Sequence, residues 1–139
     1  MKTLRRLLWL VPALCGPLLQ ADDLAPATLA KILKLVMSDA KEPDMACTDP
    51  QLRGELVKAG VTLHPDSRIV WVKSPEEAAS HATSSRITIG GKVALLKSGA
   101  IVALVSEGGR PAFYVNKEGA RARRVSLPHS ILQLGKVAQ

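Results

Sequence analysis

The sequence lacks an uninterrupted apolar run as long as the about 18 residues that a membrane-spanning helix needs. It also lacks any repeat with a period between about 20 and 50 residues. Charge is limited, because 22% of the residues are charged while 47% are apolar, a balance unlike that of disordered proteins. These absences exclude multi-pass membrane proteins, solenoids and disordered chains. A length of 139 residues then predicts one compact domain.

The first 21 residues have the pattern of an export signal. Three basic residues come first, at Lys2, Arg5 and Arg6. The apolar stretch 7–19 follows, and Ala21 precedes two acidic residues. As a helix, these 13 residues would extend about 20 Å, which is short of the roughly 30 Å hydrocarbon core of a bilayer. We therefore predict a signal peptide over residues 1–21, cleaved after Ala21, and a periplasmic mature protein; an uncleaved anchor is the alternative.

Cysteine is scarce, with only Cys15 and Cys47 in the whole sequence. Cys15 lies within the export signal and raises the alternative of a lipoprotein, but Leu14 stands where lipid attachment favours a small residue. Cleavage after Ala21 would leave Cys47 alone. The mature protein would then form no internal disulfide, and its stability must come from the core.

Part of the positive charge of the chain belongs to the export signal. The full sequence has a net charge of +7, and removing residues 1–21 leaves 16 basic and 12 acidic residues among 118, or +4. A charge of this size is ordinary for a soluble domain and gives no reason to expect nucleic-acid binding.

Helix and strand signals alternate along the first half of the mature chain. Amphipathic spacing predicts a helix from about residue 26 to 40. Further helices are predicted from Pro50, capped by Asp49, and from Ser74-Pro75 to about residue 82. Short apolar, β-branched runs predict strands over residues 45–47, 68–73 and 86–89.

The second half of the chain has a different pattern, since two apolar runs follow one another without a helix signal between them. Strands are predicted over residues 92–96, 100–106 and 111–115, with a hairpin turn over residues 107–110. We expect this half to begin with a hairpin rather than with another crossover. Asn116 is expected to cap a short helix through Ala122, and a last helix from Ser126 or Pro128 would carry Ile131, Leu132 and Val137.

Strands separated by helical segments favour parallel pairing, whereas a hairpin adds antiparallel edges. The sequence therefore predicts an α/β fold. In this fold, residues 22–139 form a single small domain, with a mixed β-sheet, flanking helices, and a C-terminal hairpin plus helix.

The C-terminal segment has an order of short motifs that resembles a known family. The motifs are Ala100–Val105, Gly108-Gly109-Arg110, Phe113–Asn116, Val125–Pro128 and Ile131–Lys136. Together they resemble the end of the YfiR-like family of exported bacterial proteins over about 40 residues. The opening helix and first strand match that family only loosely.

The resemblance implies a protein that works without catalysis. The best-known member of the YfiR-like family is periplasmic and restrains a membrane-bound diguanylate cyclase by binding its periplasmic domain. The implied partner here is a membrane-bound signalling protein of that class. Two departures limit the transfer: Cys47 has no partner for a disulfide, and residues 36–39 replace the aromatic Phe-x-x-Trp-Pro type of sequence that follows the first helix in the family.

Catalytic and metal-binding patterns are weak. Cys47 would need a base such as His64 or His81 to act as a nucleophile, and no active-site motif surrounds it. A buried small side chain is the simpler interpretation of Cys47. His64, His81 and His129 lack the spacing of zinc ligands, so we expect no metal and no cofactor.

The densest charge in the chain is a basic segment near its end. Its residues are Lys117, Arg121, Arg123 and Arg124, preceded by Asn116. This segment would suit an acidic partner, phospholipid head groups or a nucleotide phosphate, while a solvated surface and helix capping by Asn116 explain it as well.

Three functions remain open from the sequence. The first is a periplasmic, non-enzymatic regulatory protein that restrains a membrane-bound signalling protein such as a diguanylate cyclase. The second is a carrier of a small ligand or anion, since open α/β sheets bind ligands at strand ends. The third is an enzyme that depends on Cys47.

Overall fold

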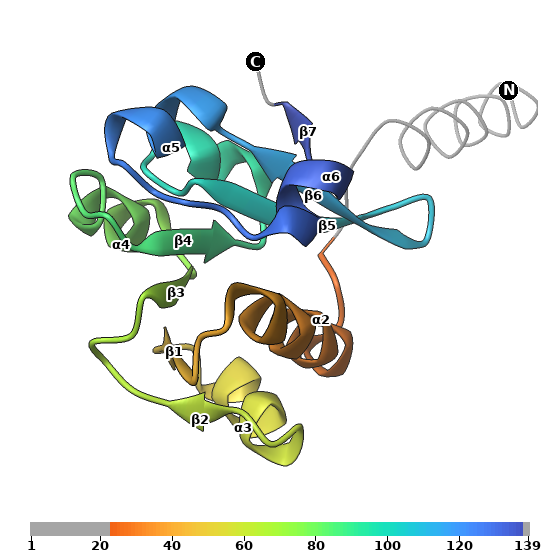
Figure 1. The fold of residues 1–139 in the computed structure, drawn as a ribbon. Helices are drawn as coiled ribbons and strands as arrows, with labels where there is room; N and C mark the ends of the chain where they lie inside the picture. The colour runs from red at the N-terminus through yellow and green to blue at the C-terminus, as the bar shows by residue number, and fades with distance from the viewer. Residues whose placement is uncertain (1–22, 138–139) are drawn as a thin grey trace, which may run out of the picture.

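The computed structural model describes residues 23–137, so the expected export signal and its cleavage site lie outside the described part. A seven-stranded sheet forms the centre of the domain, in the order β2-β1-β3-β4-β5-β6-β7 (Figure 1). The strands are β1 Asp44–Cys47, β2 Thr62–Leu63, β3 Ile69–Val72, β4 Ile87–Gly90, β5 Val102–Glu107, β6 Arg110–Val115 and β7 Lys136–Val137. The helices are α2 Pro26–Ala40, α3 Pro50–Lys58, α4 Pro75–Ser80, the 3-10 helix η1 Val93–Lys97, α5 Lys117–Ala122 and α6 His129–Leu134.

The sheet is mixed, as the alternation of elements predicted. Within the run β2-β1-β3-β4-β5, each pair of neighbouring strands is parallel. Strands β5 and β6 form an antiparallel hairpin whose last pair is Glu107 with Arg110, and β7 then pairs with β6 in parallel. The expected α/β fold with a C-terminal hairpin plus helix is confirmed.

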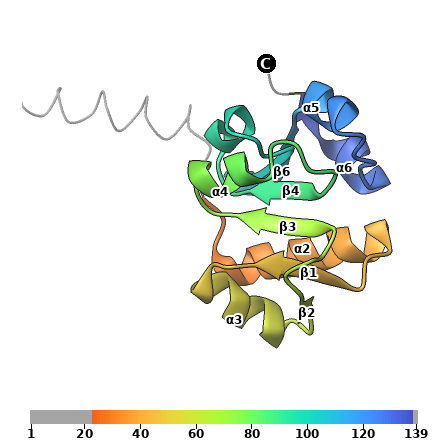
Figure 2. The ribbon, with the colours of Figure 1, turned by 90° about the vertical axis from the view of Figure 1, so that its left-hand side faces the viewer.

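Helices cover both faces of the sheet. Successive residues of a strand point to opposite faces, so one strand contributes to two different core clusters. Met45 and Cys47 join the larger core cluster, which also takes in residues of α2, α3, α5 and α6. Ala46, the residue between them, joins a smaller cluster with residues of α4 and η1. In Figure 2, α2 and α3 lie beside β1, while α4 lies beside β3. The two faces are therefore covered by different sets of helices.

Helix starts follow the predicted caps. The Asp49 carboxylate accepts from the backbone N–H of Gln51 at 3.1 Å, and the Ser74 hydroxyl accepts from the N–H of Glu77 at 3.1 Å. The Asn116 side-chain oxygen accepts from the N–H of Gly119 at 2.9 Å. Each cap gives a partner to an amide that the first helical turn leaves unbonded.

Residues 92–96 do not form the predicted strand, and the second half begins with a crossover before it reaches the hairpin at residues 107–110. Strands β4 and β5 are parallel neighbours, so the chain between them must travel back along the sheet. It does so through η1, which buries Leu95 and Leu96 in the smaller cluster. A Cβ on Gly90 would lie 2.6 Å from Leu95 Cδ1, so a side chain there would force Leu95 to move.

The last helix is also shorter than predicted. It ends at Leu134, and Val137 lies in β7, where it pairs with Val115. Gly135 has an extended backbone, and a Cβ on it would lie 2.5 Å from the carbonyl oxygen of Ile131. The chain therefore leaves the helix at Gly135 to reach the edge of β6. Strands β2 and β7 are two residues each, too short to show a periodic pattern in the sequence.

Candidate functional site

The basic segment is split by the structure. Lys117 and Arg121 lie exposed on α5. Arg124 follows this helix, is exposed as well, and has a positive φ of 55 degrees. Asn116 caps α5 through its side-chain oxygen, as one of its two interpretations predicted. The exposed residues keep their place as candidates for partner binding, which stays a prediction.

Arg123 differs from its neighbours because its guanidinium is directed into the fold. Its Nε donates to the Ser84 carbonyl at 2.7 Å, and its Nη1 donates to the Gly99 carbonyl at 2.5 Å. Its Nη2 lies 3.4 Å from both the Arg86 carbonyl and the Thr88 hydroxyl. Partial burial lowers the pKa of Arg123. This arginine therefore joins α5 to the segments around β4, and its head group is occupied by the fold.

Cys47 is buried at the end of β1, with 3% of its surface exposed. Burial raises the pKa of its thiol to about 11, so the reactive thiolate is scarce at neutral pH. His81 lines the same cavity as Cys47, but burial and the nearby Arg86 lower the pKa of His81. Within residues 23–137, no three His, Cys, Asp or Glu side chains are placed to hold a metal ion. The environment of Cys47 is that of a packed core side chain.

An apolar groove of about 630 Å³ lies between α2, the β5–β6 hairpin and α6. Its lining residues are Ile32, Leu35, Val36, Asp39, Glu107, Arg110, Pro111, Ala112, Phe113, Ser130, Leu134 and Lys136. Leu35 is 70% exposed and Leu134 is 67% exposed, which is unusual for leucine side chains that lie beside one another on a folded domain. Sequence reasoning missed this groove because its three parts are distant along the chain.

One side of the groove is held by a capping contact between distant helices. The Asp39 carboxylate, at the end of α2, accepts from the Ser130 N–H at 2.9 Å and from the Ser130 hydroxyl at 2.7 Å. Pro128, at the N-cap position of α6, provides no side-chain cap of its own. The two hydrogen bonds from Ser130 lower the pKa of Asp39. Asp39 thus supplies the missing cap and fixes α6 against α2.

The other side of the groove is held by three polar side chains at the hairpin. Lys136 Nζ lies 2.6 Å from Glu107 Oε1, and the Tyr114 hydroxyl donates to the same carboxylate. The Lys136 ammonium also lies over the Tyr114 ring, 5.6 Å from its centre. Lys136 and Tyr114 together lower the pKa of Glu107. These contacts tie β7 to Glu107, at the turn end of the β5–β6 hairpin.

Comparison with known proteins shows that another protein shares this fold. No curated protein matches the sequence. A crystal structure described as a conserved domain protein from Vibrio cholerae O1 biovar El Tor is similar, with a TM-score of 0.56 and 13% identity. The match covers 84% of this chain and 61% of that chain, so this chain spans about three fifths of its structural relative. At this identity the similarity shows a shared fold.

Between residues 23 and 137, no helix has the length and apolarity to cross a bilayer.

The sequence model of the YfiR/HmsC-like family, whose members are known as periplasmic regulators of diguanylate cyclases, matches residues 66–136. That range begins before β3 and runs into β7, and it includes the motifs on which the resemblance was based. Because the match spans more than half of the sequence, the chain belongs to the YfiR/HmsC-like family.

Proposed function

We propose that this protein is a periplasmic regulator that restrains a membrane-bound signalling protein, of the diguanylate cyclase class, by binding its periplasmic domain. Membership of a regulatory family supports the class of function. The apolar groove carries the proposal for the surface, since it is lined by Leu35 and Leu134, the two most exposed large apolar side chains between residues 23 and 137.

The groove has the composition of a protein-binding surface. Its centre is apolar, and burial of apolar surface drives association at about 25 cal/mol per Å² before the opposing entropy is counted. Its margin carries both charge signs, from Asp39 and Glu107 on one hand and Arg110 and Lys136 on the other. A charged margin around an apolar centre sets the orientation of a partner more than its affinity.

The exposed part of the basic segment is a second element of the proposal. Lys117, Arg121 and Arg124 would contribute by attracting acidic groups of the partner. Reversing Arg121 and Arg124 to Glu should then weaken partner binding without a large loss of thermal stability, since surface changes usually cost under about 0.5 kcal/mol. Arg123 is left unchanged in this variant because its guanidinium is bonded within the domain.

Capture of the partner after gentle crosslinking in membranes of the source bacterium tests the groove. We expect the wild-type protein to capture a membrane-bound signalling protein, identified by mass spectrometry, and the double variant Leu35→Asp, Leu134→Asp to lose it. Val57→Asp is the matched control, because Val57 is 61% exposed on α3 and lies outside the groove. Equal capture by all three proteins would reject the groove as the docking surface.

A cellular readout completes the test. Deleting the gene should raise the cyclic di-GMP concentration. Expression of the wild-type or the Val57→Asp protein should lower it again to its original level. The groove variant should leave the cyclic di-GMP concentration high, although the variant protein is present in the periplasm in the same amount. An unchanged cyclic di-GMP concentration after deletion would count against restraint of a cyclase, whatever the capture experiment shows.

A further inference from the structure

At one end of the sheet, the starts of four strands lie next to one another. Strands β1, β3, β4 and β5 are parallel neighbours, so all four begin at the same end. The segments that lead into them come from distant parts of the chain. Two arginine side chains, those of Arg86 and Arg123, bond to backbone carbonyls of these segments. Their contacts join this end of the sheet to the basic segment.

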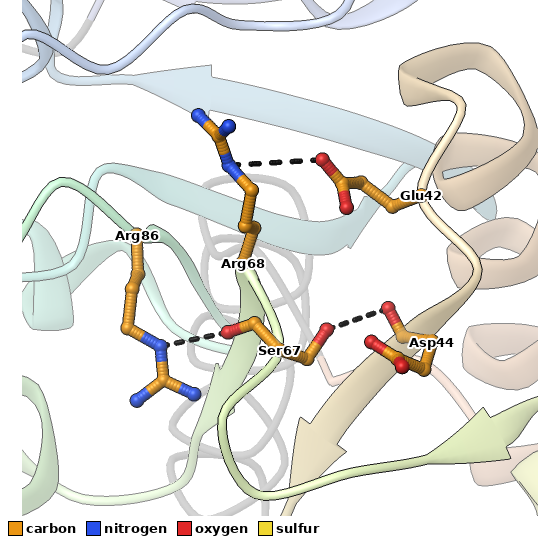
Figure 3. A network of polar contacts seen from close by, with 5 residues as sticks. All are labelled: Glu42, Asp44, Ser67, Arg68 and Arg86. Carbon is orange, nitrogen blue, oxygen red and sulfur yellow. Dashed lines mark hydrogen bonds and ion pairs between the residues drawn. The ribbon is translucent and has the colours of Figure 1, made fainter.

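Arg86 holds the connection between β2 and β3 (Figure 3). Its Nε donates to the Ser67 carbonyl at 2.7 Å, and its Nη2 donates to the Pro65 carbonyl at 2.6 Å. The buried Ser67 in turn donates its hydroxyl to the carbonyl of Asp44, at the start of β1, at 2.6 Å. Because Arg86 directly precedes β4, its side chain fixes the starts of β3 and β4 relative to each other. Ser67 extends this link to β1.

Arg123, which follows α5, bonds to the segment that contains Arg86. Its Nε donates to the Ser84 carbonyl at 2.7 Å, and its Nη2 lies 3.4 Å from the Arg86 carbonyl. Its Nη1 donates to the carbonyl of Gly99, ahead of β5, at 2.5 Å. The Ser84 hydroxyl accepts from the Arg86 N–H at 3.3 Å, which ties the two ends of segment 84–86 together. Residues 84–86 therefore connect the contacts of Arg86 to those of Arg123.

Both sets of contacts depend on the shape of the guanidinium group. An arginine presents several N–H donors in a fixed plane, whereas a lysine has one ammonium at the end of a flexible chain. Each of the two arginines uses this shape to bond to at least two carbonyls at once. The ion pairs within 4.0 Å that form between residues 23 and 137 include neither arginine. Within this part of the chain, their charges therefore strengthen hydrogen bonds to the backbone.

We propose that Arg86 is a positioning residue for the basic segment. Arg86 holds residues 84–86 against the connection to β3, and Arg123 holds α5 against residues 84–86. The helix thereby keeps Lys117 and Arg121 in a fixed arrangement that suits an acidic surface of the partner. The guanidinium of Arg86 bonds to residues 65 and 67, so its effect on α5 passes through Arg123. The inference rests on the proposed role of the basic segment in partner binding, but its first test needs no partner.

Amide hydrogen exchange, followed by NMR on the mature protein, tests the positioning. The Ala120 N–H bonds to the N-cap carbonyl at 3.0 Å, and the Val125 N–H bonds to the Ala120 carbonyl at 2.8 Å, so both amides report opening of α5. In Arg86→Met they should exchange at least about tenfold faster. The Ala59 N–H, bonded to the Glu55 carbonyl in α3, should keep its rate. Unchanged exchange in α5, or equal acceleration in α3, would overturn the proposal.

Two further variants separate bridging from charge. Arg86→Lys keeps the positive charge but loses the planar fork, so it should accelerate exchange in α5 as Arg86→Met does. It also decides the question if Arg86→Met is too unstable to measure. Wild-type exchange in the lysine variant would reject the bridging role. Arg68→Met is the matched control, since Arg68 follows Ser67 but pairs with Glu42, at 3.7 Å (Figure 3), and exchange in α5 should not respond to it.

The order of the two arginines can be tested in a double variant. Arg123→Met alone should accelerate exchange in α5, because it removes the contacts that hold the helix. If Arg86 acts through Arg123, adding Arg86→Met to this variant should change the exchange of α5 by less than about twofold. Accelerations that multiply in the double variant would show two independent contacts and reject the proposed order.

The crosslinking experiment relates the positioning to partner binding. Capture of the membrane protein should decrease in Arg86→Met, as it should in the variant with Arg121→Glu and Arg124→Glu. Reduced capture by the charge-reversal variant together with full capture by Arg86→Met would reject positioning for the partner. Full capture by both variants would instead reject the basic segment as a binding element, while hydrogen exchange still decides whether Arg86 positions α5.

Discussion

The apolar groove and the surroundings of Cys47 differ in what they leave exposed to solvent. The groove leaves leucine side chains in solvent and satisfies its polar groups among themselves, through Asp39 with Ser130 and through Glu107 with Lys136. The cavity beside Cys47 instead has a thiol that is 3% exposed and whose pKa is raised to about 11 by burial. Exposed apolar area suits a macromolecular partner, whereas a buried and protonated thiol suits the packing of a core.

The same contrast appears within the basic segment. Arg121 and Arg123 are two residues apart, yet Arg121 is exposed and Arg123 bonds to carbonyls of Ser84 and Gly99. Identical side chains in one segment thus have different roles. One is available to a partner, and the other positions α5 against β4.

The largest expected effect comes from breaking the Arg123 contacts. Arg123→Met should lower the free energy of unfolding by about 2 to 4 kcal/mol, because several carbonyls lose a charged donor. Arg121→Met is the matched control and should change it by less than about 0.5 kcal/mol. Urea unfolding followed by circular dichroism measures both. Similar losses in the two variants would show that the segment acts as one surface.

The second prediction concerns Cys47 and sharpens the difference between a packed thiol and a reactive one. With the pKa of its thiol at about 11, Cys47 should react with iodoacetamide near pH 8 about 100-fold more slowly than a free thiol whose pKa is about 8.5. The rate should increase with pH up to about 11, because the thiolate is the nucleophile. Mass spectrometry over a pH series measures the rate.

Substitution of Cys47 provides the control for its function. Cys47→Ala should leave capture of the membrane protein unchanged. Loss of the cellular phenotype in a folded Cys47→Ala protein would instead favour the enzyme that the sequence left open.

The smallest expected effect is the acid response of the groove. The pKa values of Asp39 and Glu107 are lowered in the folded protein. The two carboxylates therefore contribute fully to stability above their pKa values in the unfolded chain, about 3.9 and 4.3. This contribution is lost as the pH falls through their lower pKa values in the folded protein. The melting temperature should decrease below about pH 5, and less steeply in the double variant Asp39→Asn, Glu107→Gln.

A matched control isolates this acid response. The double variant Asp66→Asn, Glu118→Gln removes two exposed carboxylates outside the groove. It should follow the pH dependence of the wild-type protein. An equal change in slope for both double variants would mean that net charge, and not the groove contacts, controls the acid response.

The local signals in the sequence predicted most elements of this fold. The caps at Asp49, Ser74 and Asn116 and the Gly108-Gly109 turn each depend on residues within about four positions of one another. Such contacts form in the same way whatever the rest of the chain does. The alternation of these elements was enough to predict a mixed α/β sheet.

Contacts between distant segments determined the remainder. The segment 92–96 had the composition of a strand, but it forms η1 because β4 and β5 are parallel and the chain has to return between them. Asp39 and Ser130 are 91 residues apart, and Arg53 and Glu77 meet one cavity from two helices. The apolar groove and the separate role of Arg123 arise from such long-range packing, because only folding brings these segments together.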